Sequence, residues 1–169
     1  MTLTAPTGRT QTLGAGLAAL GMAVTVGTAL GFQHIGGYIP CKLCLEQRIP
    51  YYVGIPIAVL ALLAAAFKLP PLVVRGLLLV VALLMVWSIW LGGFHAGVEW
   101  GFWPGPTACG AVALPPSGGG SLLDQLDAVI PPSCDQAAGR FLGLSFAGWN
   151  VVTSVILAGI AAVAALRRS

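Results

Sequence analysis

Charged residues are scarce in this chain. Only 8% of its 169 residues are Asp, Glu, Lys or Arg, whereas 57% are hydrophobic. A soluble domain carries about 25% charged residues, so the composition excludes an ordinary soluble domain and indicates a protein solvated mainly by lipid. The small net charge of +3 reflects where the basic residues lie relative to the membrane and gives no reason to expect nucleic-acid binding. Cysteine is also scarce, with four residues, and none of them falls in a long apolar stretch.

Uncharged stretches long enough to cross a bilayer, about 17–25 residues, occur four times. They cover approximately residues 13–32, 49–67, 76–98 and 141–166. We therefore predict an all-α membrane protein, a bundle of four transmembrane helices that forms a single domain over residues 1–169. The outer loops fall at about residues 33–48 and 99–140. We expect the first stretch to be a span and not a cleaved signal peptide, because it exceeds the 7–15 apolar residues of a typical signal-peptide core.

Basic residues without acidic neighbours are confined to one side of this predicted bundle. The N-terminal segment, the short middle loop and the C-terminal segment contain no acid and five bases: Arg9, Lys68, Arg75, Arg167 and Arg168. The two other loops hold all five acids against three bases. By the positive-inside rule, both termini should be cytoplasmic and all four cysteines should face the opposite side of the membrane.

The second outer loop is rich in proline and glycine, which is typical of irregular structure. Within it, residues 121–130 place four apolar side chains on one helical face and turn Asp124 and Asp127 away. This pattern predicts a short amphipathic helix that lies on the membrane surface.

The first span is rich in small residues. Gly27 and Gly31 have the GxxxG spacing, which lets the backbones of neighbouring helices approach each other. We therefore expect a close helix contact at these two glycines.

The sequence Cys41-Lys-Leu-Cys44, with Arg48 following, lies where the first outer loop becomes the second span. Pro40 ends the preceding segment and sets Cys41 at the start of a helix. The spacing of three residues puts both sulfurs on one helical face, and a helix N-terminus favours the thiolate. Arg48 adds a cation on the same face, and a charge near membrane depth is a functional hypothesis by default. The motif predicts disulfide exchange coupled to an acceptor dissolved in the membrane, such as a quinone.

The four cysteines allow three disulfide pairings. Pairing within each outer loop, Cys41 with Cys44 and Cys109 with Cys134, is the most economical. A non-catalytic scaffold with two structural disulfides is an alternative, because loops outside the cytoplasm commonly carry disulfides. A structural zinc site would need four thiolates, or thiolates with His95, in fixed geometry. The chain has a single CxxC, so we predict no metal.

The cysteine motif resembles that of the DsbB family. The resemblance rests on the residues Phe32-Gln33-His34, Pro40-Cys41-Lys-Leu-Cys44-Leu-Glu-Gln-Arg48, Cys134-Asp135, Phe141-Leu142-Gly143-Leu144-Ser145 and Gly148-Trp149-Asn150. It implies a multi-pass enzyme of the bacterial inner membrane, a protein-disulfide:quinone oxidoreductase that generates disulfides de novo. The implied partners are a periplasmic DsbA-like protein of thioredoxin fold, the membrane lipid, and a quinone pool of ubiquinone or menaquinone.

The resemblance also implies a role for each cysteine. Cys109 would form the mixed disulfide with the DsbA-like partner, and Cys134 would pass the electrons on to Cys41. Cys44 would then contact the quinone, with Arg48 polarising one of its carbonyl groups.

Two further positions bear on the quinone site. His95 matches a family histidine close to the quinone, with a capping or interfacial histidine as the alternative; His34 is a weaker candidate. Gly139 departs from the family, because some relatives have an aromatic residue there. Trp149 or Phe141 would have to take over the role of that aromatic side chain.

A vitamin K epoxide reductase-like enzyme is a second alternative, since that family also couples thiols to quinones on a similar bundle. It usually carries its CxxC on the last core helix, whereas here the motif opens the second span. The order of the motifs therefore favours the DsbB-like interpretation.

Overall fold

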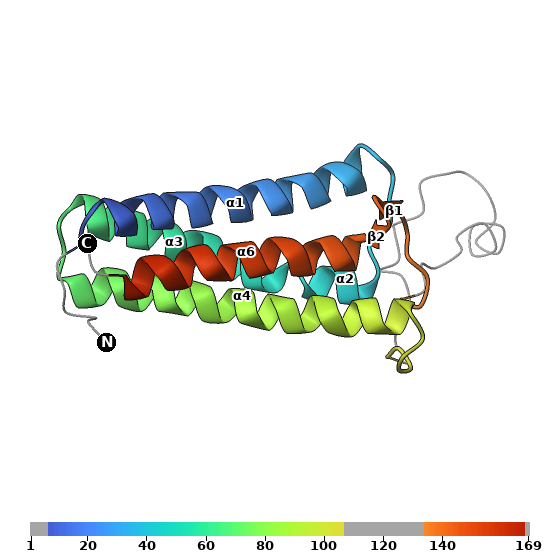
Figure 1. Ribbon diagram of the computed structural model, residues 1–169. Helices are drawn as coiled ribbons and strands as arrows, with labels where there is room; N and C mark the ends of the chain where they lie inside the picture. The colour runs from blue at the N-terminus through green and yellow to red at the C-terminus, as the bar shows by residue number, and fades with distance from the viewer. Residues whose placement is uncertain (1–6, 107–133, 168–169) are drawn as a thin grey trace.

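A computed structural model describes residues 7–106 and 134–167, which form a bundle of long helices (Figure 1). The long helices are α1 (Arg9–His34), α3 (Ile49–Ala66), α4 (Pro71–Glu99) and α6 (Phe146–Leu166). A short helix, α2 (Lys42–Glu46), precedes α3, and a hairpin of two strands, β1 (Arg140–Phe141) and β2 (Leu144–Ser145), precedes α6. Within the described residues, four helices are long and apolar enough to cross a membrane, α2 being counted with α3. The predicted four-helix membrane bundle is confirmed, and the amphipathic helix predicted at residues 121–130 lies outside the described residues.

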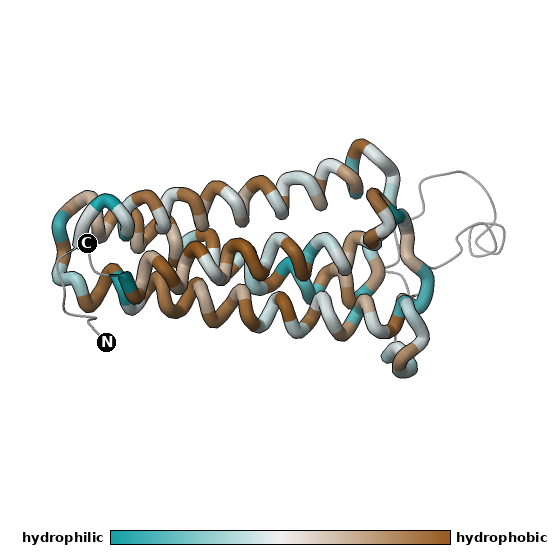
Figure 2. The backbone as a smooth tube through the Cα atoms, in the orientation of Figure 1, coloured by the Kyte–Doolittle hydropathy of each residue, from teal (hydrophilic) through white to brown (hydrophobic). Residues whose placement is uncertain are grey.

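The two ends of the bundle differ in composition. α1 begins and α6 ends at the end that also carries the α3–α4 turn, which we call the basic end (Figure 1). α2 and the hairpin lie at the opposite end, which we call the cysteine end because it carries Cys41, Cys44 and Cys134. Hydrophobic residues cover most of the length of the helices, and hydrophilic residues gather toward the two ends (Figure 2). The helices therefore alternate in direction, as the predicted order of spans and loops requires.

Helix α6 begins at Phe146, whereas the fourth span was predicted to begin at Phe141. Between these positions the chain forms the β1–β2 hairpin, whose two turn residues, Leu142 (φ 50°) and Gly143 (φ 83°), both have positive φ. Two positive φ angles are the signature of a tight hairpin turn that follows the twist of its strands. Ser145 then starts the helix, because its Oγ accepts a hydrogen bond from the Gly148 N–H at 3.2 Å.

The close contact of α1 lies nearer the basic end than predicted. A Cβ placed on Gly27 or Gly31 would meet no atom within 4 Å. A Cβ on Gly14 would instead collide with the Cβ of Ala164, and one on Gly21 would lie 2.6 Å from Leu157 Cδ2. The expectation from the GxxxG spacing was therefore wrong, because α1 packs against α6 along its first half and leans away from it toward the cysteine end (Figure 1).

Two buried polar side chains, on α4 and α1, bind the end of α6 at the basic end. Arg75, whose side chain is completely buried, donates from Nη1 to the carbonyl oxygens of Ala165 and Arg167, each at 2.8 Å. Gln11 donates from Nε2 to the carbonyl oxygens of Ala164 and Arg167, each at 3.0 Å. These donors satisfy the carbonyl groups that the end of a helix leaves without intrahelical partners. Arg75 was counted in the sequence only as a topology signal, and it also caps α6.

Candidate functional site

Helix α2 brings the two thiols of the CxxC motif together. Cys41 is the N-cap of α2, with extended backbone (φ −74°, ψ 171°), and its Sγ accepts a hydrogen bond from the Cys44 N–H at 3.4 Å. The two Sγ atoms lie 3.2 Å apart, and both cysteines are free thiols. Cys41 is buried, with 4% of its surface exposed, and Cys44 is half-buried. The three-residue spacing thus produces a dithiol with one sulfur inside the protein and one at its edge.

His95, near the end of α4, lies beside the buried sulfur. Its Nε2 is 3.7 Å from Cys41 Sγ and 3.7 Å from Glu99 Oε1. Its Nδ1 is 2.6 Å from Gln47 Nε2. An amide nitrogen can only donate, so this contact assigns the ring proton to Nε2. The histidine therefore directs an N–H group toward the thiol and the carboxylate.

The hydrogen bond from the Cys44 thiol is the largest influence on the ionisation of Cys41. It lowers the pKa of the Cys41 thiol from 9.0 to about 4, against the opposing effect of burial and with smaller help from His95 and the Cys44 N–H. Hydrogen bonds to the charged form favour it, and desolvation disfavours it. At neutral pH the reduced pair therefore carries one negative charge, centred on the buried sulfur and shared with its hydrogen-bonded partner.

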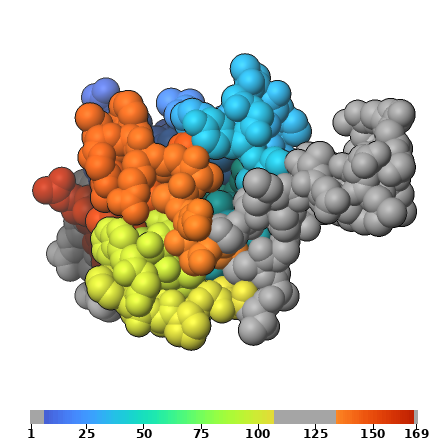
Figure 3. Space-filling model, turned by 90° about the vertical axis from the view of Figure 1, so that its right-hand side faces the viewer, coloured from blue at the N-terminus to red at the C-terminus, as the bar shows by residue number. Residues whose placement is uncertain are grey.

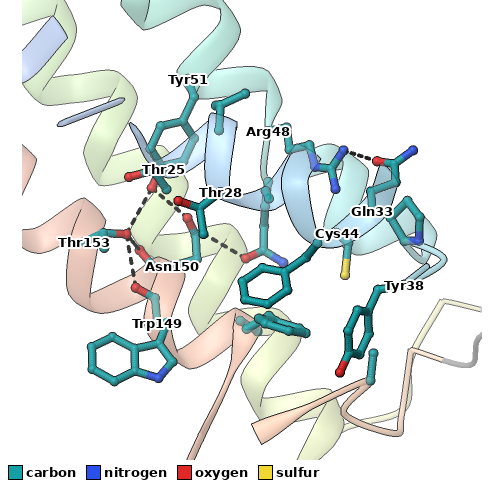
Figure 4. A pocket seen from close by; sticks show the side chains of 18 of the residues that line it. Thr25, Thr28, Gln33, Tyr38, Cys44, Arg48, Tyr51, Trp149, Asn150 and Thr153 are labelled. Carbon is teal, nitrogen blue, oxygen red and sulfur yellow. Dashed lines mark hydrogen bonds between the residues drawn. The ribbon is translucent and has the colours of Figure 1, made fainter. Parts of the chain in front are cut away.

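A pocket of about 500 Å³ opens beside Cys44, between α1, the α2–α3 segment and α6. Cys44, Arg48 and Gln33 lie together at one side of it, and Tyr51, Asn150 and Thr153 lie together at the other (Figure 4). Most of its wall is apolar or aromatic, whereas Cys41 and His95 are not among the lining residues. The dithiol thus faces the pocket with the half-buried sulfur and the interior of the protein with the other.

Arg48 faces the same pocket as Cys44. Its Nη1 donates a hydrogen bond to Gln33 Oε1 at 2.6 Å, which ties the start of α3 to the end of α1. The side chain is half-buried, and it lines the pocket. Lys42, by contrast, is exposed and lies outside the pocket lining. The two cations of this segment therefore have different surroundings.

A network of polar side chains continues from Gln47 into the bundle. Asn150 Nδ2 donates to Gln47 Oε1 at 2.8 Å, and the Tyr51 hydroxyl donates to Asn150 Oδ1 at 2.7 Å. Tyr51 also contacts Ser154 Oγ at 2.7 Å, and Ser154 donates to Ser88 Oγ at 2.9 Å. Polar groups inside an apolar bundle are costly unless they are hydrogen-bonded. The network therefore holds Gln47, and through it His95, in one position.

Cys134 reaches the same region from the segment between α4 and β1. It is 2% exposed, it is disulfide-bonded, and it belongs to one buried cluster with Cys41, Leu43 and Val98. Figure 3 looks onto the cysteine end and shows the segment after residue 134 (orange) beside the α1–α2 segment (blue) and the end of α4 (yellow-green). Cys109, the other predicted loop cysteine, lies outside the described residues. The fold therefore places one cysteine of the second loop next to the dithiol of the first.

Aromatic residues close the pocket near Gly139. A Cβ on Gly139 would lie 3.2 Å from the Phe146 ring and 3.5 Å from the Tyr38 ring. Trp149 and Phe141 both line the pocket, and Trp149 Nε1 donates to the Phe141 carbonyl oxygen at 2.8 Å. The pocket therefore has aromatic walls although position 139 lacks a side chain.

Some residues at this site were not singled out from the sequence. Gln47, Asn150 and Tyr51 form the polar network, and Glu99 lies beside His95. Asn150 could have been found from the sequence, because it is a polar residue within an apolar span. Glu99 could have been found from its position four residues after His95, which puts both side chains on one face of a helix. His34, a weak candidate in the sequence, is exposed and lies outside the pocket lining.

Comparison with known proteins gave a family match and one relative of unknown role. A family model described as disulfide bond formation protein DsbB matches residues 11–164. The uncharacterized protein RP370 of Rickettsia prowazekii (strain Madrid E) is 26% identical over 136 residues, which covers 79% of this chain and 76% of the relative. No solved structure matched the chain significantly.

Proposed function

Since the chain belongs to the DsbB family of membrane proteins for disulfide bond formation, we propose that it reoxidises a DsbA-like thiol oxidant and passes the electrons to a membrane quinone. The family assignment and the four apolar helices make it a multi-pass membrane oxidoreductase of disulfide formation. The proposal adds three points to this assignment: the electron acceptor is a quinone, the partner has a thioredoxin fold, and the cysteine loops face the periplasm.

The observation that carries the quinone assignment is the shared pocket of Cys44 and Arg48. A quinone ring needs flat apolar walls, a donor for a carbonyl oxygen and a thiol within reach. Phe146 and Trp149 contribute such walls, and the Arg48 guanidinium is a permanently charged donor. The residues present therefore fit a quinone head group, which when bound would accept two electrons and two protons. Ubiquinone and menaquinone both meet this description.

The protein residues then have distinct tasks during electron transfer. Arg48 would orient a carbonyl group of the quinone and stabilise the negative charge that grows on it. The Cys44 sulfur, at the pocket wall, would deliver the electron pair while the Cys41 thiolate bonds to it and closes the disulfide. The pair, which carries one thiol proton at neutral pH, would thus lose two electrons and that proton, and water would supply the second proton of the quinol. His95 would hold the Cys41 thiolate through its Nε2–H group until that bond forms.

Electrons would enter through the second cysteine pair. Exchange requires a thiolate to attack a disulfide through a mixed intermediate. Cys109 would form that intermediate with the reduced partner, and Cys134 would pass the electrons on to Cys41. The burial of Cys134 in one cluster with Cys41 supports this step. Each exchange breaks one disulfide and forms another, so the number of disulfides changes only when the quinone is reduced.

The decisive experiment is quinone reduction by the purified protein. Reduced DsbA-like protein is added to the full-length protein with ubiquinone or menaquinone, and the quinone absorbance is followed. We expect catalytic conversion to quinol together with oxidation of the partner. Cys44→Ser should abolish quinone reduction, whereas Cys134→Ser should trap a covalent adduct between Cys109 and the partner. A stable protein that neither reduces quinone nor forms the adduct would instead be a scaffold with structural disulfides.

A further inference from the structure

Metal-binding side chains meet at the reduced dithiol. One ligand atom each from Cys41, Cys44 and His95 lies within 4.8 Å of the others. The individual distances are 3.2 Å between the two sulfurs and 3.7 Å from Cys41 Sγ to His95 Nε2. Glu99 Oε1 is a further 3.7 Å from the same His95 nitrogen. Two thiols, an imidazole and a carboxylate are the ligand types that Zn²⁺ takes in proteins.

One carboxylate oxygen of Glu99 has no hydrogen-bond partner within the described part of the chain. The side chain is only 4% exposed. Its Oε2 is buried and has no hydrogen-bond partner among the residues that the structure describes. Burying a carboxylate without partners is costly, because the protein must replace the lost hydration. A bound cation is one way to supply that missing interaction.

We propose that Cys41, Cys44, His95 and Glu99 form a site for a thiophilic divalent cation such as Zn²⁺, and that this site exists only in the dithiol form. The inference rests on the proposed function, because the cation would regulate the same redox pair. It also revises the expectation from the sequence that the chain binds no metal. That expectation concerned a permanent structural zinc, whereas the site here is made and removed by the redox state.

The observed distances are close to those of a tetrahedral zinc site. Bond lengths of about 2.3 Å to sulfur and about 2.0–2.1 Å to nitrogen or oxygen place tetrahedral ligands about 3.8 Å apart for two sulfurs and about 3.5 Å for sulfur and nitrogen. The corresponding separations here are 3.2 Å and 3.7 Å. The Cys44 side chain would have to move by a few tenths of an ångström. Glu99 lies outside the group of three mutually close ligand atoms, so its carboxylate would also have to move toward the two sulfurs to complete the geometry.

Gln47 supplies the outer partner that such a histidine needs. A histidine that binds metal through Nε2 carries its proton on Nδ1 and donates it to a neighbouring acceptor. Gln47 lies at Nδ1 and presents its amide nitrogen there in the metal-free geometry. Rotation of the amide by half a turn would present Oε1 instead, at the expense of the hydrogen bond from Gln47 Nε2 to the Leu43 carbonyl oxygen. Asn150 would have to turn as well, because its Nδ2 donates to Gln47 Oε1. Metal binding through His95 Nε2 thus requires these two amides to turn together.

The redox state controls the site because zinc binds thiolate sulfur. Oxidation joins the two sulfurs at about 2.05 Å and removes both anionic ligands. In the reduced form, binding displaces the one thiol proton that remains at neutral pH. A bound cation would therefore hold the pair reduced and keep the electrons from the quinone. The consequence is inhibition that begins when the pair is reduced and ends when the cation is removed.

The test measures binding separately from activity. Full-length protein carrying Cys109→Ser and Cys134→Ser, so that only the first pair titrates, is prepared in the dithiol and the disulfide form. Cd²⁺ is added, and the ultraviolet cadmium–thiolate absorption is followed. We expect saturable binding by the dithiol form and none by the disulfide form. Glu99→Gln should weaken binding by about tenfold or more, the loss that even outer-shell partners of a metal site cause. Circular dichroism and gel filtration of this variant check its fold.

Glu46→Gln is the matched control, because Glu46 is an acid on α2 outside the ligand cluster. It should bind Cd²⁺ as the parent does. Equal absorption changes in both redox forms, or unaltered affinity in folded Glu99→Gln, would overturn the inference.

In parallel, Zn²⁺ should inhibit quinone reduction by the parent chain, and a chelator should restore it. If the chain in chelator reduces quinone and its dithiol does not bind Cd²⁺, the metal site fails while the proposed function stands. If the dithiol binds Cd²⁺ and no quinone is reduced, the proposed function fails while the metal site stands.

Discussion

Arg48 and Lys42 are neighbouring cations with different surroundings, since Arg48 lines the pocket beside Cys44 and Lys42 is exposed. Removing a charged hydrogen-bond donor costs about 1.5–3 kcal/mol, which corresponds to roughly a 10-fold to 100-fold effect. Arg48→Ala should therefore raise the apparent KM for quinone, or lower the rate, by about that factor. Arg48→Lys should recover only part of the loss, because an ammonium lacks the planar fork of guanidinium.

Steady-state quinone reduction in detergent, at equal protein concentration, measures this effect. Lys42→Ala is the control and should behave as the parent chain. Unchanged kinetics of Arg48→Ala would make Arg48 an anchor at the membrane interface and nothing more.

The ionisation of Cys41 is testable by titration. Because its folded pKa is lowered to about 4, the thiolate should be fully formed at neutral pH and should disappear only as the pH falls through about 4. Thiolate absorbance of the dithiol form, measured against pH in the Cys109→Ser and Cys134→Ser background, reports this directly. Cys44→Ala removes the largest favourable influence and should raise the pKa most, whereas His95→Ala should raise it less. A Cys44→Ala titration that coincides with its parent's would contradict the assigned cause.

Among single residues, the sequence predicts the reactive ones better than the residues that hydrogen-bond to them. The spacing of Cys41, Cys44 and Arg48 was sufficient to expect a dithiol beside a cation. The contact of Glu99 with His95 follows from their four-residue spacing within α4. The contact of Gln47 with the same ring depends instead on how the end of α4 meets α2. That meeting joins residues about 50 positions apart, and no local spacing reports it.

Helix α1 determines where the pocket forms. It touches α6 closely at Gly14, while its second half, from Val24 to Gln33, borders the pocket. Gly14→Ala should lower the stability of the bundle by about 1–3 kcal/mol, the usual cost of overpacking a tight contact. Thermal unfolding in detergent, or resistance to denaturant, provides the measurement.

Gly27→Ala is the control for this contact, because a Cβ there meets nothing within 4 Å and alanine favours the helix more than glycine does. It should be neutral or slightly stabilising. Equal destabilisation by both substitutions would contradict the assignment of the α1–α6 contact to Gly14.

The sequence was sufficient to predict which segments form the long helices. It was not sufficient to predict where those helices contact one another. Hydropathy located all four spans, because a lipid-facing helix must be apolar over its whole length. It also ran through the apolar hairpin at Phe141–Leu144 and so placed the start of the fourth span too early. Nor could the GxxxG spacing of Gly27 and Gly31 reveal which glycines meet a neighbour, because that depends on how α1 tilts.

For the whole molecule, the alternation of helices gives a topology that can be measured. α1 begins, α6 ends and the α3–α4 turn lies at the basic end, so these parts should share one side of the membrane. By the positive-inside rule this side should be the cytoplasm. Alkaline phosphatase fused after Gly105 should be active in the periplasm, and fused after Pro70 it should be inactive. The opposite pattern would invert the topology and remove the oxidising compartment that the cysteines require.

The burial of Cys41 and Cys134 in one cluster has a consequence for side reactions with small soluble thiols. Each keeps less than a twentieth of its surface exposed, so the exchange proposed between them would take place out of contact with water. Small soluble thiols can approach an enzyme from any direction, but they cannot collide with a sulfur that solvent does not reach. In the proposed relay, the step between these two cysteines would therefore be shielded from soluble thiols, while Cys44 stays accessible from the pocket. Protection of this step against unwanted reduction would then come from packing, because the burial of both sulfurs excludes a soluble thiol whatever its structure.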